Sequence, residues 1–157
     1  DGVSRLEETI MSKATPEVSV PVVQAVAGAI LAANLVYPAV ILGMRSAGIL
    51  GEEGLGGLPP DTARILTYAL FAAGVVTVLI SFPVRKVLER IAVPDDVPVL
   101  FHRMRAIVVV LAIADAAGVM AFVLALLTGE ILGPALLWGL AIGAGILHFP
   151  TRAWLER

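Results

Sequence analysis

Cysteine is absent from the 157-residue chain, and charged residues make up only 15% of it. Without cysteine, disulfide bonds, thiolate metal sites and thiol redox chemistry are excluded. Soluble domains contain about 25% charged and about 45–50% apolar residues, whereas this chain is 59% hydrophobic with a mean hydropathy of +0.94. So few charges cannot cover a surface that faces water. The composition therefore indicates an integral membrane protein.

Basic residues are too few to form a nucleic-acid-binding surface, because the formal net charge is −2. Recognisable catalytic motifs are also missing: the sequence has no zinc-protease motif, no glycine-rich phosphate loop and no nucleophile elbow. We therefore expect no nucleic-acid partner, no enzymatic activity and no metal site. His102 and His148 could in principle hold a haem. Both fall at a membrane boundary, where histidine is an ordinary residue, so we expect no cofactor.

Four apolar segments have about the length, roughly 20 residues, that a helix needs to cross the hydrocarbon core. They run over 22–44, 65–82, 107–127 and 131–149. Lipid cannot satisfy unpaired backbone groups, and the segments lack the strict alternation of barrel strands, so we expect helices. The chain 1–157 is thus predicted to be a single all-α transmembrane domain, a four-helix bundle.

The distribution of lysine and arginine predicts the orientation of this bundle. Nine of the eleven cationic residues lie before the first segment, between the second and third, or after the fourth. These nine residues are Arg5, Lys13, Arg85, Lys86, Arg90, Arg103, Arg105, Arg152 and Arg157. Only Arg45 and Arg64 flank the other side. The positive-inside rule then places both termini on the cytoplasmic side of the membrane. We expect this membrane to be a bacterial-type inner membrane.

The segment 84–92, between the second and third apolar segments, has a pattern of its own. Its apolar residues share one helical face, opposite a charged face, and are Val84, Val87, Leu88 and Ile91. This spacing predicts a short amphipathic helix that lies in the headgroup layer of the membrane. A docking helix for a soluble partner is the less favoured alternative.

Asp115 is the one charged residue within the third apolar segment. It lies roughly 12 Å along that helix, near the middle of the bilayer. A carboxylate at this depth costs about 2.5–3.5 kcal/mol, so it must face protein or water, or carry a proton. Asp115 either fixes helix packing by hydrogen bonding or carries protons or cations. Asn34 and Gln24, in the first segment, are its candidate partners in both cases.

The sequence around Asp115, LAIADAAGVMAFVLALL, resembles the carboxylate-bearing helix of the proteolipid (subunit c) of ATP synthase and vacuolar-type ATPases. That helix has an Ala-acid-Ala core followed by a run of valine, leucine and alanine. The resemblance implies that Asp115 corresponds to the ion-carrying carboxylate and that the chain belongs to a rotor ring. It covers one segment of four, and the preceding segment has only Gly74 where the family has a glycine ladder.

Proline and glycine residues predict where helices bend and where they approach each other. Pro38 cannot donate a backbone hydrogen bond and clashes with the carbonyl of Asn34, so we expect a kink in the first helix. Small residues let helices pack closely. Those at expected contact positions are Gly118, Gly139, Gly143 and Gly145. Their partners are either helices of the same bundle or those of another subunit.

A bundle with so few inward-facing polar groups differs from a transporter, which has broken helices and a polar lining. We therefore expect an accessory or structural subunit of a larger inner-membrane complex. Its partners would be the lipid bilayer and other membrane subunits, or further copies of the chain. The alternative is a proteolipid-like proton or cation carrier in which Asp115 is the titrating group.

Overall fold

The structure is a computed structural model that describes residues 18–93 and 97–155. Within these ranges all regular secondary structure is helical, which confirms the predicted class. The helices are α2 (Val20–Ser46), α3 (Pro60–Arg90), α4 (Val99–Thr128), α5 (Leu132–His148) and the short α6 (Arg152–Leu155). The first three predicted segments fall inside α2, α3 and α4, which extend beyond them at both ends by between one and eight residues.

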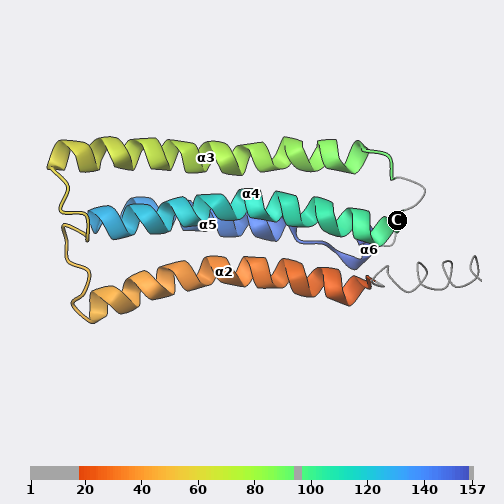
Figure 1. Ribbon diagram of the computed structural model, residues 1–157, viewed down its shortest axis with the longest axis horizontal. Helices are drawn as coiled ribbons and strands as arrows, with labels where there is room; N and C mark the ends of the chain where they lie inside the picture. Colours follow the sequence, from red (N-terminus) through yellow and green to blue (C-terminus); the bar gives the residue numbers. More distant parts are fainter. Residues whose placement is uncertain (1–17, 94–96, 156–157) are drawn as a thin grey trace, which may run out of the picture.

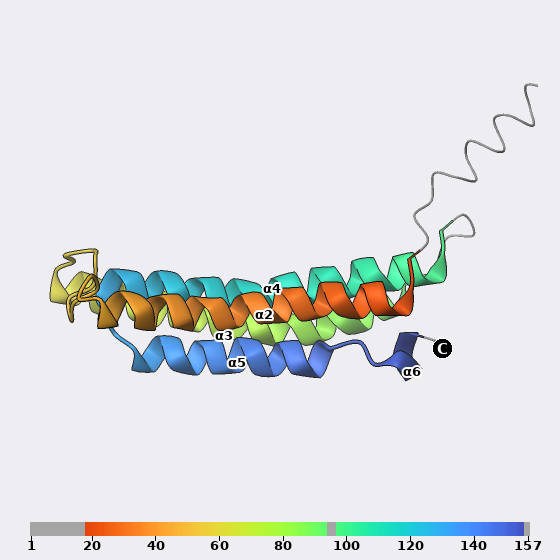
Figure 2. The same cartoon turned by 90° about the horizontal axis from the view of Figure 1, so that it is seen from below.

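The four longer helices pack as an up-and-down bundle with α4 and α5 as its central pair. Figure 1 shows α2 and α3 on opposite sides of this pair. Figure 2, turned by 90°, shows α5 in a layer of its own, with α4 on the far side of the bundle. The ends of α3 and α5 and the starts of α2 and α4 lie together at one end of the molecule. We call this the basic end, because Arg85, Arg90, Arg103 and Arg105 belong to it.

Three helices, α2, α3 and α4, are long and apolar enough to cross a membrane. In the most apolar part of α4, 44% of the residues are buried, against 17% in α2 and α3, so α4 is the most enclosed of the three. α5 is also apolar but has only 17 residues. At 1.5 Å per residue it spans about 26 Å, slightly less than the hydrocarbon core of about 30 Å.

The prediction of a separate interfacial helix over 84–92 is wrong. α3 continues without a break from Pro60 to Arg90 and passes through Pro83. Arg85, assigned by the pattern to a water-facing side, instead reaches across to α5, where its Nη1 donates to the carbonyl of Leu147 at 3.0 Å. This contact holds the last turns of α3 against the bundle. α2 likewise continues through Pro38, and Figure 1 shows its axis bowed rather than straight.

At the opposite end, the irregular segment 47–59 covers the C-terminus of α4. Gly129 ends α4 in the left-handed conformation with φ 69°, and its N–H donates to the carbonyl of Ala125 at 2.9 Å. The N–H of Leu55 donates to the carbonyl of Leu126 at 2.7 Å, and Arg45 Nη1 donates to that of Gly129 at 3.3 Å. These donors satisfy carbonyls that the end of a helix leaves free.

Gly129→Ala is expected to destabilise the protein more than Gly57→Ala. Both glycines have positive φ, which costs a residue with a Cβ about 1–2 kcal/mol. A Cβ at Gly129 would also lie 2.6 Å from the backbone nitrogen of Gly54, whereas none of the described atoms lies within 4 Å of one at Gly57. Overpacking adds about 1–3 kcal/mol. The measurement is the free energy of unfolding in mixed detergent–SDS micelles, and equal losses in the two variants would contradict this account of the loop.

Candidate functional site

The structure brings Asp115 of α4 against two donors on α2. Asn34 Nδ2 donates to Asp115 Oδ1 at 2.7 Å, and Tyr37 Oη donates to Oδ2 at 3.5 Å. Asn34 and Tyr37 are three residues apart, so one face of α2 presents both groups. Asn34 is buried, whereas Asp115 keeps part of its surface exposed. Both carboxylate oxygens are thus engaged by a single neighbouring helix.

Gly118 lies one turn beyond Asp115 and completes the contact with α2. A Cβ at Gly118 would collide with Asn34 Oδ1, so only glycine fits beneath this amide. Asn34 Oδ1 is buried and accepts no hydrogen bond from the described residues. On another side, the carbonyl of Gly118 accepts a hydrogen bond from Trp138 Nε1 of α5 at 3.0 Å. Gly118 therefore lies where α2, α4 and α5 meet.

The three predicted contact glycines of α5 differ in whether they contact another helix of this bundle. A Cβ at Gly145 on α5 would collide with Leu31 of α2, so Gly145 serves an internal helix contact. By contrast, none of the described atoms lies within 4 Å of a Cβ built at Gly139 or Gly143. The GxxxG pair is therefore open on the outside of α5.

Gln24 is not part of the Asp115 cluster. It precedes Asn34 by ten residues, which corresponds to about 15 Å along a helix. Its Nε2 donates instead to the carbonyl of Pro150 at 3.3 Å. Gln24 thus ties α2 to the segment that follows α5, at the basic end, and cannot act together with Asp115.

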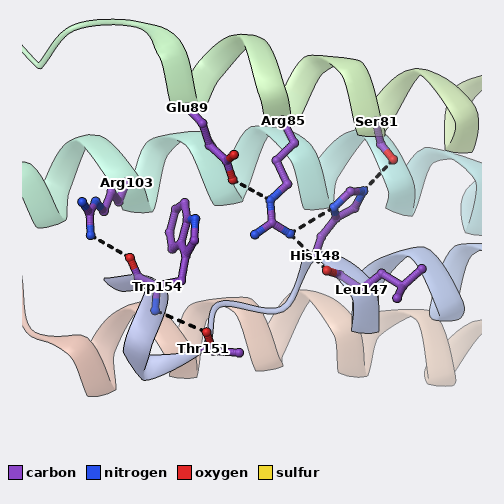
Figure 3. Close-up of polar contacts among 8 residues, drawn as sticks. All are labelled: Ser81, Arg85, Glu89, Arg103, Leu147, His148, Thr151 and Trp154. Carbon is purple, nitrogen blue, oxygen red and sulfur yellow. Dashed lines mark hydrogen bonds and ion pairs between the residues drawn. The ribbon is translucent and has the colours of Figure 1, made fainter. Parts of the chain in front are cut away.

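A second polar cluster, which the sequence analysis missed, surrounds His148 at the end of α5 (Figure 3). His148 is only 2% exposed, although its position predicts an ordinary boundary residue. Its Nε2 lies 2.8 Å from Ser81 Oγ, and its Nδ1 lies 3.4 Å from Arg85 Nη1. Its ring packs against that of Phe82 in a tilted arrangement, with 4.6 Å between the centroids. The available signal was the spacing of Ser81 and Arg85, which places both on one face of α3.

The hydrogen bonds around His148 are complete with a neutral imidazole. Arg85 can only donate, so Nδ1 must accept, and the ring proton is then on Nε2. Nε2 donates to Ser81 Oγ, and Ser81 donates its own proton to the carbonyl of Val78 at 2.6 Å. A catalytic serine needs the opposite arrangement, with a carboxylate behind the histidine. This cluster therefore fastens α3 to α5 and does not form a nucleophilic site.

Both ring nitrogens of His148 are engaged, so neither is available to coordinate a haem iron. Over residues 18–93 and 97–155, no group of three or more His, Cys, Asp or Glu side chains is placed to hold a metal ion.

Arginines also fasten the C-terminal helix α6 to the bundle. Arg103 Nη1 donates to the carbonyls of Trp154 and Leu155 at 2.7 and 2.8 Å. The guanidinium groups of Arg85 and Arg103 each lie 5.5 Å from the centroid of the Trp154 ring, within the range of cation–π attraction. Arg85 is oriented further by Glu89, one turn along α3, at 2.8 Å. Figure 3 shows these side chains converging from α3, α4 and the C-terminal segment.

Comparison of the chain with protein-family models, with curated proteins and with solved structures finds no match. The interpretation of the two polar clusters therefore rests on their own geometry.

Gly118→Ala is expected to lower the free energy of unfolding by about 1–3 kcal/mol, because the new methyl group forces Asn34 out of its position. Gly139→Ala is the matched control, since its methyl group meets open space. In an Asn34→Ala background, the cost of Gly118→Ala is expected to fall, because the colliding amide is gone. Unfolding in mixed micelles measures all three effects. An unchanged cost in that background would show that Gly118 is constrained by something other than Asn34.

Proposed function

We propose that this protein is a non-catalytic accessory or structural subunit of a larger inner-membrane complex. The observation that carries the proposal is the open GxxxG pair, Gly139 and Gly143, on the outer face of α5. Such a pair lets a second helix approach closely enough for backbone contact. Leu136 and Leu140, one turn apart on the same helix, are 56% and 43% exposed and are available to pack beside it.

The polar groups inside the bundle support the same role. Asp115 is bound by Asn34 and Tyr37, and His148 is bound by Ser81 and Arg85. Each set links helices of this chain to one another. Polar side chains that are held by other helices of the same chain in this way stabilise packing, whereas a conducting path needs groups that exchange partners with water.

The orientation we propose has both termini and the basic end in the cytoplasm. The positive-inside rule supports it, because the cationic residues in the last turns of α3 and the first turns of α4 share one end of the molecule. The two cationic residues expected on the other side, Arg45 and Arg64, border the segment 47–59 at the opposite end.

Replacing both open glycines, Gly139→Leu with Gly143→Leu, is expected to abolish association with partner subunits while leaving the stability of the isolated chain unchanged. The bulky side chains would keep another helix at a distance, and a Cβ at either position meets none of the described atoms of this bundle within 4 Å. Native mass spectrometry of the gently solubilised complex measures the partners and their ratio. Gly28→Leu with Gly43→Leu is the matched control, because these glycines of α2 are equally open.

Proteins that co-purify in a fixed ratio with the wild type and the control, but not with the α5 variant, would support the proposal. A wild-type protein that is monodisperse, free of partners and able to move ions alone would overturn it.

A proteolipid-like proton or cation carrier is the second candidate function. Asp115 keeps part of its surface exposed despite its two hydrogen bonds, which favours this alternative. A carrier of this kind would purify as a large homo-oligomer, and Asp115→Asn would abolish ion flux into reconstituted vesicles. Flux that is the same in Asp115→Asn and the wild type would eliminate it.

A further inference from the structure

The C-terminal turns of α3 and the N-terminal turns of α4 enclose a groove at the basic end. It consists of two neighbouring hollows of about 210 and 310 Å³, which share Leu88, Ile91, His102 and Ala106 as walls. The inner hollow continues toward Trp154, and the outer hollow opens beside Arg105. The larger, outer hollow is of the size at which small-molecule sites begin, about 300 Å³.

The lining of the outer hollow is amphipathic. Leu88, Ile91, Ala106 and Val109 provide apolar walls, while Arg105 and His102 provide polar groups. Because α4 runs from the basic end toward the middle of the bundle, Val109 lies one turn deeper than Arg105. An acyl chain therefore fits against the deep side of the hollow, and a negatively charged headgroup fits against its rim.

The charges around the two hollows differ, and this difference makes the outer hollow the better binding site for an anion. The inner hollow includes Glu89, whose carboxylate is paired with Arg85 at 2.8 Å. The outer hollow has no acidic side chain among its described lining residues. Arg105 forms no ion pair with a described residue, and its guanidinium lies 6.0 Å from the centroid of the Phe101 ring. An exposed cation thus stands over an apolar hollow.

We propose that the outer hollow is a binding site for one anionic phospholipid of the surrounding membrane. Its phosphate group accepts hydrogen bonds from Arg105 and His102, and the start of one acyl chain lies along Ala106 and Val109. Basic pockets between transmembrane helices bind anionic headgroups for this physical reason. The proposal is independent of the accessory-subunit function, because it needs only the α3–α4 groove of the single chain.

The test is a lipid titration of the purified full chain in neutral detergent, followed by native mass spectrometry. Phosphatidylglycerol and phosphatidylcholine of identical acyl chains are the probes. The wild type is expected to retain phosphatidylglycerol at lower concentration than phosphatidylcholine. Arg105→Gln is expected to weaken phosphatidylglycerol binding about fivefold, the effect of one arginine at a membrane surface, whereas Arg105→Lys retains most of it. All variants are made in the full chain, so that Asp95 and Asp96 are present in every sample.

Arg64→Gln is the matched control. Arg64 also lies over an aromatic ring, that of Tyr68 at 5.9 Å, but it belongs to the opposite end of the bundle. Equal weakening by Arg64→Gln and Arg105→Gln would show general charge attraction and overturn the proposal. Equal retention of the two lipids by the wild type would also overturn it. Displacement of phosphatidylglycerol by millimolar inorganic phosphate would identify a site for free anions and refute the lipid assignment.

Discussion

The contact between Asp115 and α2 is the constraint on which the arrangement of the bundle depends. A carboxylate halfway along an apolar helix needs hydrogen-bond donors from protein, because lipid offers none. Asn34 and Tyr37 supply these donors from one face of α2. Since both donors must meet the same carboxylate, α2 can neither slide along α4 nor rotate against it without breaking a hydrogen bond. A single acidic residue thereby fixes the register of two helices.

The small residues of α4 make this contact possible. Ala114, Ala117, Ala121 and Ala125 are each at most 1% exposed, and Gly118 lies among them. With so little side-chain volume on α4, the neighbouring helices approach closely and large side chains from those helices fill the gaps. Trp138 of α5 is the clearest case, because it packs in the core and also donates to the Gly118 carbonyl. The second polar cluster, around His148, fastens α3 to α5 in the same way at the basic end.

Residue patterns were sufficient to predict the helical class, the apolar segments and the proximity of Asn34 to Asp115, because hydrophobic length and a lone charge within an apolar segment are local signals. They failed for the segment 84–92, where a helical face that looks solvated in isolation is partly covered by α5 through Arg85. They failed for His148 and Gln24 for a related reason. Their partners, the Ser81 hydroxyl and the Pro150 carbonyl, are not marked by any local pattern, and only the packing of the helices brings them near. The rotation of each helix about its own axis decides whether a predicted contact glycine faces the bundle or the outside. A spacing of four residues in the sequence does not determine this rotation.

The most direct test of this account is the coupling free energy between Asn34 and Asp115, obtained from the unfolding of Asn34→Ala, Asp115→Ala and the double variant in mixed micelles. We expect a favourable coupling of about 0.6 kcal/mol, the average for hydrogen bonds between membrane helices, and no more than about 1.7 kcal/mol, the largest value for such a bond. Additive effects of the two substitutions would show that the pair does not hold α2 to α4. In that case Asp115 would need another reason for its place in the membrane, and the structural role proposed for it would fail.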